Sequence, residues 1–492
     1  MPDLITGFAL VAVVLVVAGL TSGFVERAPL SFPIIFLGLG FLIGGHGLGV
    51  LEIGVEDPVL ETVATLTLAL VLCLEGMRIG NESMEGAGAV PVLSLGPGTI
   101  IIISVVASGS HFLLGTSLVE SLLLGTILAS TDPVVLRDVV RDERIPRSVR
   151  QALNIEAGTN DIVVLPILLV LIAVANAEAT GAAGWALFAA QILLLGPAVG
   201  FAIGTGAAWL MSRADERYAI SEVYQSLYGI GIILAAFSTA QALGGDGFLA
   251  AFAAGFAIAI LNFDLCECFL NYGETTAEMA MLLSFILFGV VVSDLFVEVP
   301  LVPALLLSAI VLFIARPLAI GLVLRKAAVS NAARWFIGWF GPRGLNSLLL
   351  ALLLIHASVP GAEFLLAVVG FVVTVSVVLH GASATPLSTI YARAVDADTH
   401  EEEREGSSGG IFSGAATGAA RVSPEELAAM LESGDPPLVL DVRTRSQFER
   451  DGRRIPGALR VRSDEVEEWA RSRQDEHRGS QVEGQRIVAY CT

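Results

Sequence analysis

The stretch Ser130-Thr131-Asp132-Pro133 interrupts an otherwise apolar run over residues 118–136. Pro133 has no N–H to return to the carbonyl of Ala129, so a helix through this run must open there. At membrane depth an opened helix exposes carbonyl groups, which is tolerable only inside protein or beside water. The stretch therefore predicts a broken helix with a polar site at the break.

A second break is expected within the apolar run 335–359, which contains Phe340-Gly341-Pro342-Arg343-Gly344. Either break alone is weak evidence, because Gly and Pro are common in membrane helices. Two interrupted helices at matching positions in two halves are typical of inverted-repeat transporters, whose substrate site lies where the broken helices meet. A charged residue beside each break strengthens this interpretation.

The composition is that of a membrane protein: of 492 residues, 54% are hydrophobic and 15% are charged, and the mean hydropathy is +0.76. These values exclude a water-soluble enzyme of this length. Stretches of about 20 apolar residues, enough for a helix to cross a bilayer core of about 30 Å, recur up to about residue 390. We expect an all-α polytopic membrane protein with 13 spans, at 4–22, 30–50, 60–77, 90–114, 118–136, 151–176, 186–211, 225–244, 247–263, 277–297, 301–324, 335–359 and 363–388.

The charge balance excludes a nucleic-acid partner, because the formal net charge is −20, with 28 Lys+Arg against 48 Asp+Glu. Cations before residue 395 fall in alternate loops, apart from Arg316 and Arg343, which predicts an N-terminus outside and a C-terminus inside the cell. The loop cations are Arg27, Arg78, Arg137, Arg141, Arg144, Arg147, Arg150, Arg213, Arg217, Arg325, Lys326, Arg334 and Arg393. Membrane lipids are therefore expected partners.

Two arginines fall within expected spans, where each costs about 2.5–3.5 kcal/mol on insertion scales unless it is paired. These are Arg316 and Arg343. Carboxylates at the same depth outnumber them, which favours a cation site or protonated carboxylates and disfavours an anion carrier. The carboxylates are Glu75, Asp132, Glu156 and Asp161.

The two acids of the sixth expected span, Glu156 and Asp161, are expected to have different roles. Glu156 and Asn160 are four apart and share one helix face, whereas Asp161 lies one step round. Glu156 is expected to form a structural ion pair with Arg316. With no third arginine to neutralise it, Asp161 is the predicted functional acid, facing a separate, solvated cavity.

Four motifs together resemble the monovalent cation:proton antiporter family, in its NhaP-like sodium/proton exchanger branch, over about residues 1–395. The motifs are Ser130-Thr131-Asp132-Pro133, Glu156 through Asn160-Asp161, Arg316-Pro317 and Gly341-Pro342-Arg343-Gly344. The resemblance implies a homodimer of 13-helix protomers with an inverted repeat and crossed, discontinuous helices 5 and 12. No cofactor is expected.

The resemblance also implies roles for single residues. Asp161 would bind the ion or the proton, with Na⁺ held at Asp161 and by oxygen ligands of Thr131, while Asp132 would neutralise helix ends at the crossing. Asn160, in place of a second aspartate, marks the electroneutral branch. Ala157 stands where the family often has a serine, which leaves the choice between Na⁺ and K⁺ open.

Two further groups complete the expected site. Glu75, near the inner end of the third span, is placed in the ion- and proton-binding set, and Arg343 is placed in the structural ion-pair set with Glu156 and Arg316. One carboxylate can hold a cation or a proton but not both, so competition at Asp161 would produce exchange and a bell-shaped pH profile.

The C-terminal part is a separate module. An acidic and Gly/Ala-rich linker is expected at 396–420 and an α/β domain at 421–492. Leu438 to Arg443, Gly452 to Ala458 and Ile487 to Cys491 resemble the rhodanese (sulfurtransferase) domain. Cys491 matches the rhodanese cysteine, but only Thr492 follows it, so the loop that would cradle a persulfide is missing and sulfurtransferase activity is not expected.

The expected function is therefore transport, namely antiport of Na⁺ against H⁺ across the cell membrane, electroneutral, for sodium extrusion and pH homeostasis. K⁺ and Li⁺ are alternative cations. A passive cation channel, a K⁺/H⁺ efflux antiporter regulated by its tail, and a membrane-anchored enzyme remain alternatives at this point.

Overall fold

A computed structural model describes residues 32–81, 94–142, 144–177, 181–261, 263–326, 330–398, 424–431, 437–442, 454–461 and 487–490, and a few residues between 12 and 20. The chain divides into two compact units, Met1–Thr417 and Gly418–Thr492. The first unit is helical throughout its described secondary structure. Most of the expected span at 4–22 and most of the expected linker lie outside the described residues.

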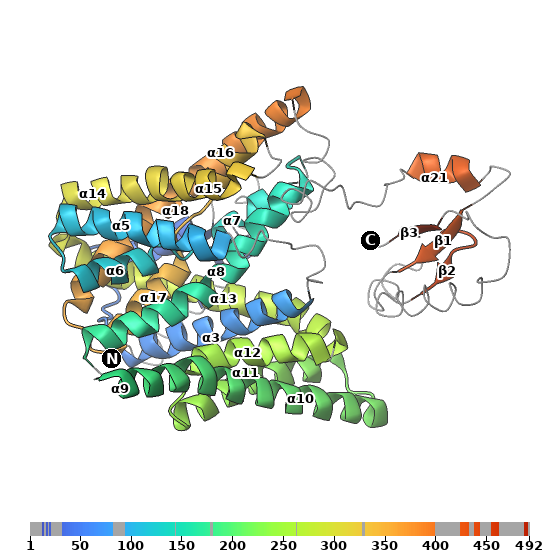
Figure 1. The fold of residues 1–492 in the computed structure, drawn as a ribbon, viewed down its shortest axis with the longest axis horizontal. Helices are drawn as coiled ribbons and strands as arrows, with labels where there is room; N and C mark the ends of the chain where they lie inside the picture. The colour runs from blue at the N-terminus through green and yellow to red at the C-terminus, as the bar shows by residue number, and fades with distance from the viewer. Residues whose placement is uncertain are drawn as a thin grey trace. The chain divides into compact units, whose positions relative to one another are not determined.

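The helices of the first unit pack as two groups (Figure 1). The first group consists of α2 (Phe32–Ile43), α3 (Pro58–Asn81), α10 (Gly196–Tyr218), α11 (Glu222–Ala242), α12 (Gly247–Leu261) and α13 (Phe263–Leu295), with α9 (Gly181–Ala189) leading into it. The second group consists of α5 (Thr99–Leu114), α6 (Leu118–Ile127), α7 (Pro133–Arg141), α8 (Arg147–Ala175), α14 (Leu301–Ala309), α15 (Arg316–Val323), α16 (Asn331–Trp339), α17 (Leu345–His356) and α18 (Ala362–Asp398).

Small residues bring the first group into backbone contact. Gly200 and Gly204 lie four apart on α10, and a Cβ atom on either would overlap the backbone of Ala250 or Ala254 on α12. Between α3 and α12, a Cβ on Gly255 would likewise overlap the carbonyl of Cys73. In a membrane, where lipid tails are as apolar as the side chains, such close packing is a main source of helix association.

Three prolines within the spans lie in or just after π-helical turns. The segment η5 (Ile310–Ala315) precedes Pro317, η3 (Ala190–Leu195) precedes Pro197, and η2 (Ser94–Gly98) contains Pro97. The wider i→i+5 pairing of a π-turn re-pairs carbonyls that a proline nitrogen cannot serve. These helices therefore continue past their prolines, unlike the runs at Pro133 and Pro342.

Eight helical stretches of the described residues are long and apolar enough to cross a membrane, by length and composition. They are Pro58–Ile79, Leu95–Leu114, Val149–Ala175, Ala183–Tyr218, Val223–Ala242, Tyr272–Leu295, Leu301–Val323 and Ala362–Arg393. Four shorter apolar helices are Phe32–Ile43, Leu118–Ile127, Gly247–Leu261 and Leu345–His356. The main departure in boundaries is α13, which begins at Phe263, well before the expected start at 277.

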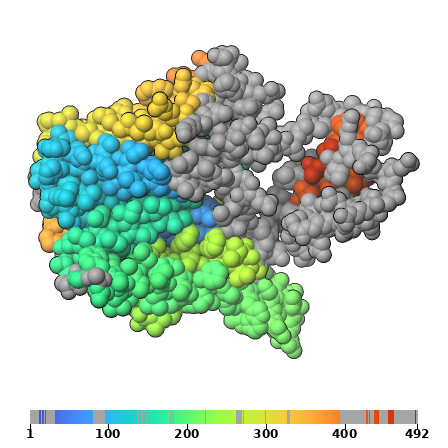
Figure 2. Space-filling view, viewed as in Figure 1, coloured from blue at the N-terminus to red at the C-terminus, as the bar shows by residue number. Residues whose placement is uncertain are grey.

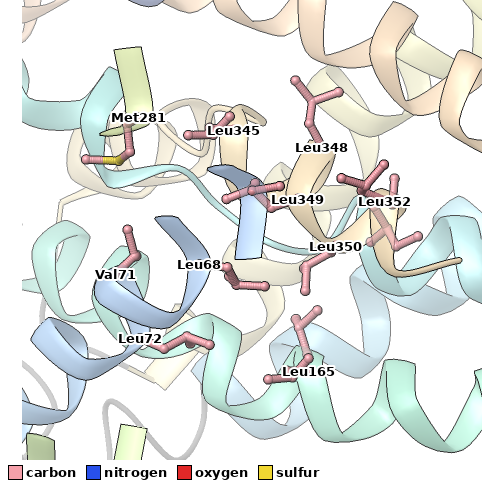
Figure 3. Packing of buried hydrophobic residues seen from close by; sticks show 14 of the residues in the cluster. Leu68, Val71, Leu72, Leu165, Met281, Leu345, Leu348, Leu349, Leu350 and Leu352 are labelled. Carbon is pink, nitrogen blue, oxygen red and sulfur yellow. The ribbon is translucent and has the colours of Figure 1, made fainter. Parts of the chain in front are cut away.

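The two groups meet across a contact built largely from leucine. Leu68 and Leu72 of α3 face Leu165 of α8 and Leu349 and Leu352 of α17 (Figure 3), and all are nearly inaccessible to solvent. Surfaces of this kind gain their stability from close packing of many weak dispersion contacts.

The outer face of the second group carries apolar side chains. Figure 2 shows α5 and α14 side by side on this face, and these helices contact each other. Ile100 and Phe112 of α5 and Leu305 and Leu306 of α14 are exposed. A broad apolar exterior of this kind suits contact with lipid.

The second unit contains α21 (Pro424–Leu431) and a three-stranded parallel sheet in the order β2-β1-β3. The strands are β1 (Leu438–Asp441), β2 (Leu459–Arg460) and β3 (Ile487–Tyr490), with Leu440 paired to Leu459 and to Ala489. Arg460 lies 3.5 Å from the buried carboxylate of Asp441. Cys491 lies outside the described residues.

Candidate ion-binding site

Both expected breaks are present, and they lie against each other. The chain is not helical between α6 and α7, at residues 128–132, or between α16 and α17, at residues 340–344. The backbone N–H of Asp132 in the first break donates to the carbonyl of Pro342 in the second, at 2.9 Å. Ser347, just beyond the second break, donates to the carbonyl of Ile127 at the end of α6, at 3.1 Å.

Asp132 caps two helices at once. Its Oδ1 accepts from the backbone N–H of Val134 in the first turn of α7, at 2.7 Å, and its Oδ2 accepts from the N–H of Leu345, the first residue of α17, at 2.6 Å. Helix N-termini carry unpaired N–H groups and a partial positive charge, which a carboxylate offsets. Gly344 permits this approach, because a Cβ there would overlap the Asp132 carboxylate.

Arg343 lies at a helix C-terminus, the end of α6. Its Nη1 donates to the carbonyls of Ala129 and Ser130, at 2.8 and 2.9 Å, just past the C-terminus of α6, where a cation is favourable. Its Nε and Nη2 have no hydrogen-bond partner among the described residues. Arg343 was expected in a structural ion pair, and among the described residues its guanidinium is instead hydrogen-bonded to these two carbonyl groups.

Asp161 lies in the middle of α8 and is fully buried. Its Oδ1 accepts from the hydroxyl of Ser130 at 2.6 Å, and its Oδ2 accepts from the amide of Asn346 at 2.6 Å. Both donors are neutral, and each comes from beside one of the two breaks. The carboxylate is therefore anchored by hydrogen bonds while its charge remains available to a cation or a proton.

Asn160 ties α8 to the first break. Its Nδ2 donates to the carbonyl of Ala129 at 2.8 Å and to Oγ1 of Thr131 at 3.4 Å. Its Oδ1 is buried and has no hydrogen-bond partner among the described residues. Buried amide oxygens are normally satisfied, so this oxygen is a candidate ligand for a hard cation. Thr131, the other expected ligand, is also buried and contacts Asn160, the residue that precedes Asp161.

Glu156 and Arg316 form a buried ion pair one turn away from Asn160. Nη1 of Arg316 donates to Oε1 of Glu156 and Nη2 donates to Oε2, the latter at 3.0 Å. Nε and Nη2 also donate to the carbonyls of Ile337 and Phe340, at 3.2 and 2.9 Å. This fork of bonds satisfies a buried guanidinium, which makes the pair a structural bridge between α8, α15 and the end of α16.

A cavity of about 240 Å³ lies between the two helix groups. It is lined by Val71, Leu74, Glu75, Arg78, Pro133, Val134, Leu136, Val140, Asn154, Ala157, Glu274, Ala277 and Met281. Glu75 is 1% exposed, and neither of its carboxylate oxygens has a hydrogen-bond partner among the described residues. Asp161 is absent from this lining, and the lining residue of α8 nearest to it in sequence is Ala157, one turn before it.

The sequence analysis assigned no role to two side chains of this site, Ser130 and Asn346. Ser130 was part of the first motif without a role of its own, and Asn346 belongs to an ordinary-looking leucine-rich helix. A usable signal existed, because Asn346 follows the second break by two residues and is polar in an apolar run. The pair of Arg78 and Glu274 at the cavity has no local signal, since the two residues are far apart in the sequence.

Two family profiles match the chain. The profile described as "Sodium/hydrogen exchanger, transmembrane" matches residues 11–389, and the rhodanese-like domain profile matches residues 423–492. The chain is 28% identical over 357 residues to the K(+)/H(+) antiporter NhaP of Alkalimonas amylolytica, covering 72% of this chain and 61% of that protein. It is 29% identical over 392 residues to the K(+)/H(+) antiporter NhaP2 of Shewanella sp. (strain ANA-3), covering 78% and 67%. The chain thus spans 61% of the length of the first of these curated relatives.

A solved structure shares the fold. The sodium proton antiporter MjNhaP1 from Methanocaldococcus jannaschii superimposes with a TM-score of 0.65 at 17% sequence identity, covering 79% of this chain and 99% of that one. The resemblance drawn from the motifs is confirmed by these matches. The helical unit makes this chain a member of the sodium/hydrogen exchanger family, and a rhodanese-like domain follows it.

Proposed function

We propose that the protein exchanges a monovalent cation for protons across a membrane, with Asp161 as the group that carries either one. The observation that supports this most directly is the environment of Asp161. It is fully buried, and its carboxylate is held by the neutral donors Ser130 and Asn346, one beside each helix break.

Exchange follows from the chemistry of one carboxylate. A hard cation requires oxygen ligands, and the side-chain oxygens of Ser130, Thr131, Asn160 and Asp161 are grouped here. Binding the cation requires Asp161 to be deprotonated, and binding the proton excludes the cation. With one carrier group, the protein has to take one species out and the other back, and movement of one helix group against the other alternates access.

The neighbouring charges have supporting roles in this proposal. Asp132 and Arg343 offset the helix ends at the break, where the crossing of two discontinuous helices is expected, and Glu156 with Arg316 holds α8 in place. Glu75 lies on the wall of the cavity and is proposed to receive the cation on its way to Asp161. One proton returned for each cation makes the cycle electroneutral. The membrane potential, which contributes about 2.3 kcal/mol per net charge moved across 100 mV, then does not drive the exchange.

The proposed cation is Na⁺ or K⁺, with Li⁺ as a third candidate. Na⁺ is favoured by the name of the matching family profile and K⁺ by the names of the two curated relatives, and Ala157 leaves the choice open. We propose a location in the cell membrane as a homodimer, with the N-terminus outside and the rhodanese-like domain in the cytoplasm. The proposed role is sodium extrusion and pH homeostasis, with the C-terminal domain regulating rather than catalysing sulfur transfer.

The deciding experiment uses purified full-length protein in liposomes loaded with a pH-sensitive dye. Gradients of Na⁺, K⁺ or Li⁺ are imposed in turn, and in the Na⁺ and Li⁺ series equal K⁺ and valinomycin hold the voltage at zero. We expect cation-driven proton movement in the wild type and none in Asp161→Asn. Asp57→Asn is the matched control, because Asp57 caps the exposed start of α3, where asparagine caps equally well.

Each outcome decides a point. Exchange that persists in Asp161→Asn shows that another group carries the ion. Cation flux that produces a current without moving protons identifies a passive channel. The ranking of the three cations by apparent KM identifies the substrate.

A further inference from the structure

A single arginine faces two carboxylates at the cavity. Arg78 follows Glu75 by three residues on α3, so both side chains lie on the same face of that helix and both line the cavity. Nη2 of Arg78 donates to Oε1 of Glu274 on α13, at 2.9 Å. The Arg78 and Glu274 side chains are 36% and 47% exposed, whereas Glu75 is 1% exposed. The cavity therefore runs from a buried carboxylate to an ion pair at the surface.

Arg78 donates its hydrogen bond to Glu274, although Glu75 lies on the same face of its own helix. Glu75 is buried and has no hydrogen-bond partner among the described residues, so it is the carboxylate with more to gain from a guanidinium. A neighbour three residues away on a helix is within reach of such a bond. The guanidinium is instead drawn to Glu274, which leaves the Glu75 carboxylate open to the cavity.

We propose that Glu274 is a positioning residue for cation entry: by holding Arg78 at the surface end of the cavity, it keeps the guanidinium off Glu75. This inference rests on the proposed function, in which Glu75 receives the incoming cation. Without Glu274, Arg78 turns inward and pairs with Glu75, and the cation then competes with a tethered guanidinium for the same oxygens. The loss falls on the apparent KM for the cation, because chemistry at Asp161 is untouched.

Three variants in the full-length protein in liposomes test this inference. Glu274→Gln removes the charge that holds Arg78, and we expect the apparent KM for the cation to rise about two- to fivefold with little change in maximal rate, the range set by half-exposed ion pairs. Arg78→Gln combined with Glu274→Gln removes the competing guanidinium as well, and the KM is expected to return to within about twofold of wild type. Glu216→Gln is the control, because it removes an exposed acid of α10 that does not line the cavity.

Ionic strength separates this mechanism from simple attraction of cations by Glu274. An effect of the surface field fades when an impermeant salt shortens the screening length from about 10 Å at 0.1 M to about 3 Å at 1 M. Pairing of Arg78 with the buried Glu75 is screened much less, so the KM difference between the single and the double variant is expected to persist in high salt. A difference that disappears there overturns the positioning role.

Two further results would overturn it: a KM for Glu274→Gln no higher than that of Glu216→Gln, or a double variant as impaired as the single one. The wild-type measurement separates this failure from that of the proposed function. If the wild type shows no exchange, the proposed function fails. If the wild type exchanges cations and Glu274→Gln matches it, only the positioning role fails.

Discussion

The side-chain amide of Asn346 donates a hydrogen bond of 2.6 Å to Oδ2 of Asp161, and so joins the helix after the second break to the middle of α8. Removing it in Asn346→Ala deletes a donor that favours the charged carboxylate. Such a bond to a charged group is worth about 1.5–3 kcal/mol. The protonated form of Asp161 is then favoured over the charged form. We therefore expect the acidic limb of the pH profile of exchange to shift to higher pH by about one unit or more.

The measurement for Asn346→Ala is cation-driven proton movement between pH 5 and 9. Asn176→Ala serves as control, because Asn176 donates a bond of 2.6 Å to the carbonyl of Ala357 at the other end of α8. A profile of Asn346→Ala that coincides with that of the control would show that this bond does not bias protonation of Asp161.

Gly344→Ala is expected to separate the two breaks. Its new methyl group would overlap the Asp132 carboxylate, which caps both α7 and α17. Overpacking of this kind costs about 1–3 kcal/mol. Because the site is built on the break, we also expect exchange to fall at least about tenfold. Gly321→Ala is the control, since nothing lies within 4 Å of its added Cβ.

Thermal unfolding in detergent and exchange in liposomes check this pair of glycine variants. Gly321→Ala should be neutral or stabilising by up to about 1 kcal/mol, because alanine is the better helix former. Equal melting temperatures and exchange rates for both variants would mean that the break accommodates the added methyl group without strain.

Arg316→Gln is expected to destabilise the protein strongly, by about 3–5 kcal/mol, because it leaves Glu156 as a buried, uncompensated charge. The double variant Glu156→Gln with Arg316→Gln removes both charges and should recover most of that loss. Size-exclusion profiles after a heating series give the midpoints, and exposed Arg393→Gln is the control. A double variant less stable than the single one would contradict a purely structural pair.

The pH dependence of cation affinity follows from competition at Asp161. Below the pH at which the carboxylate loses its proton, protons occupy the site, and the apparent KM for the cation should fall by up to about tenfold for each unit of rising pH. At high pH the KM becomes constant, and the rate then declines because protons are scarce. Initial rates at several cation concentrations and pH values measure this, and a KM independent of pH between 5 and 9 would exclude shared binding.

Much of the helical unit could be predicted because a helix that crosses a membrane needs about 20 mainly apolar residues. The two breaks were predictable because Asp132-Pro133 and Gly341-Pro342-Arg343-Gly344 place proline beside polar residues. Pro197 and Pro317 each follow a π-turn and the helix continues without a break, although Pro317 stands beside the charged Arg316. Proline alone is thus a poor predictor of an opened helix.

Side-chain partners were harder to predict because they depend on helices distant in the sequence. Arg343 was expected in an ion pair, but the hydrogen bonds found for it among the described residues go to carbonyls at the open end of α6. A solvated cavity was expected at Asp161, whereas the lining of the 240 Å³ cavity includes Ala157, Glu75, Arg78 and Glu274 but not Asp161. Depth along a helix can be read from the sequence, whereas the tilt that decides which turn meets water cannot.

The leucine contact between the two helix groups has a mechanical consequence. Leu68, Leu165, Leu349 and Leu352 have side chains without donors or acceptors, so these four can slide past one another without breaking a hydrogen bond. The glycine-closed helices on one side resist internal shear, because their backbones touch. If the two groups move against each other as proposed, we expect the displacement to occur at this leucine boundary, where side chains can shift from one groove to the next.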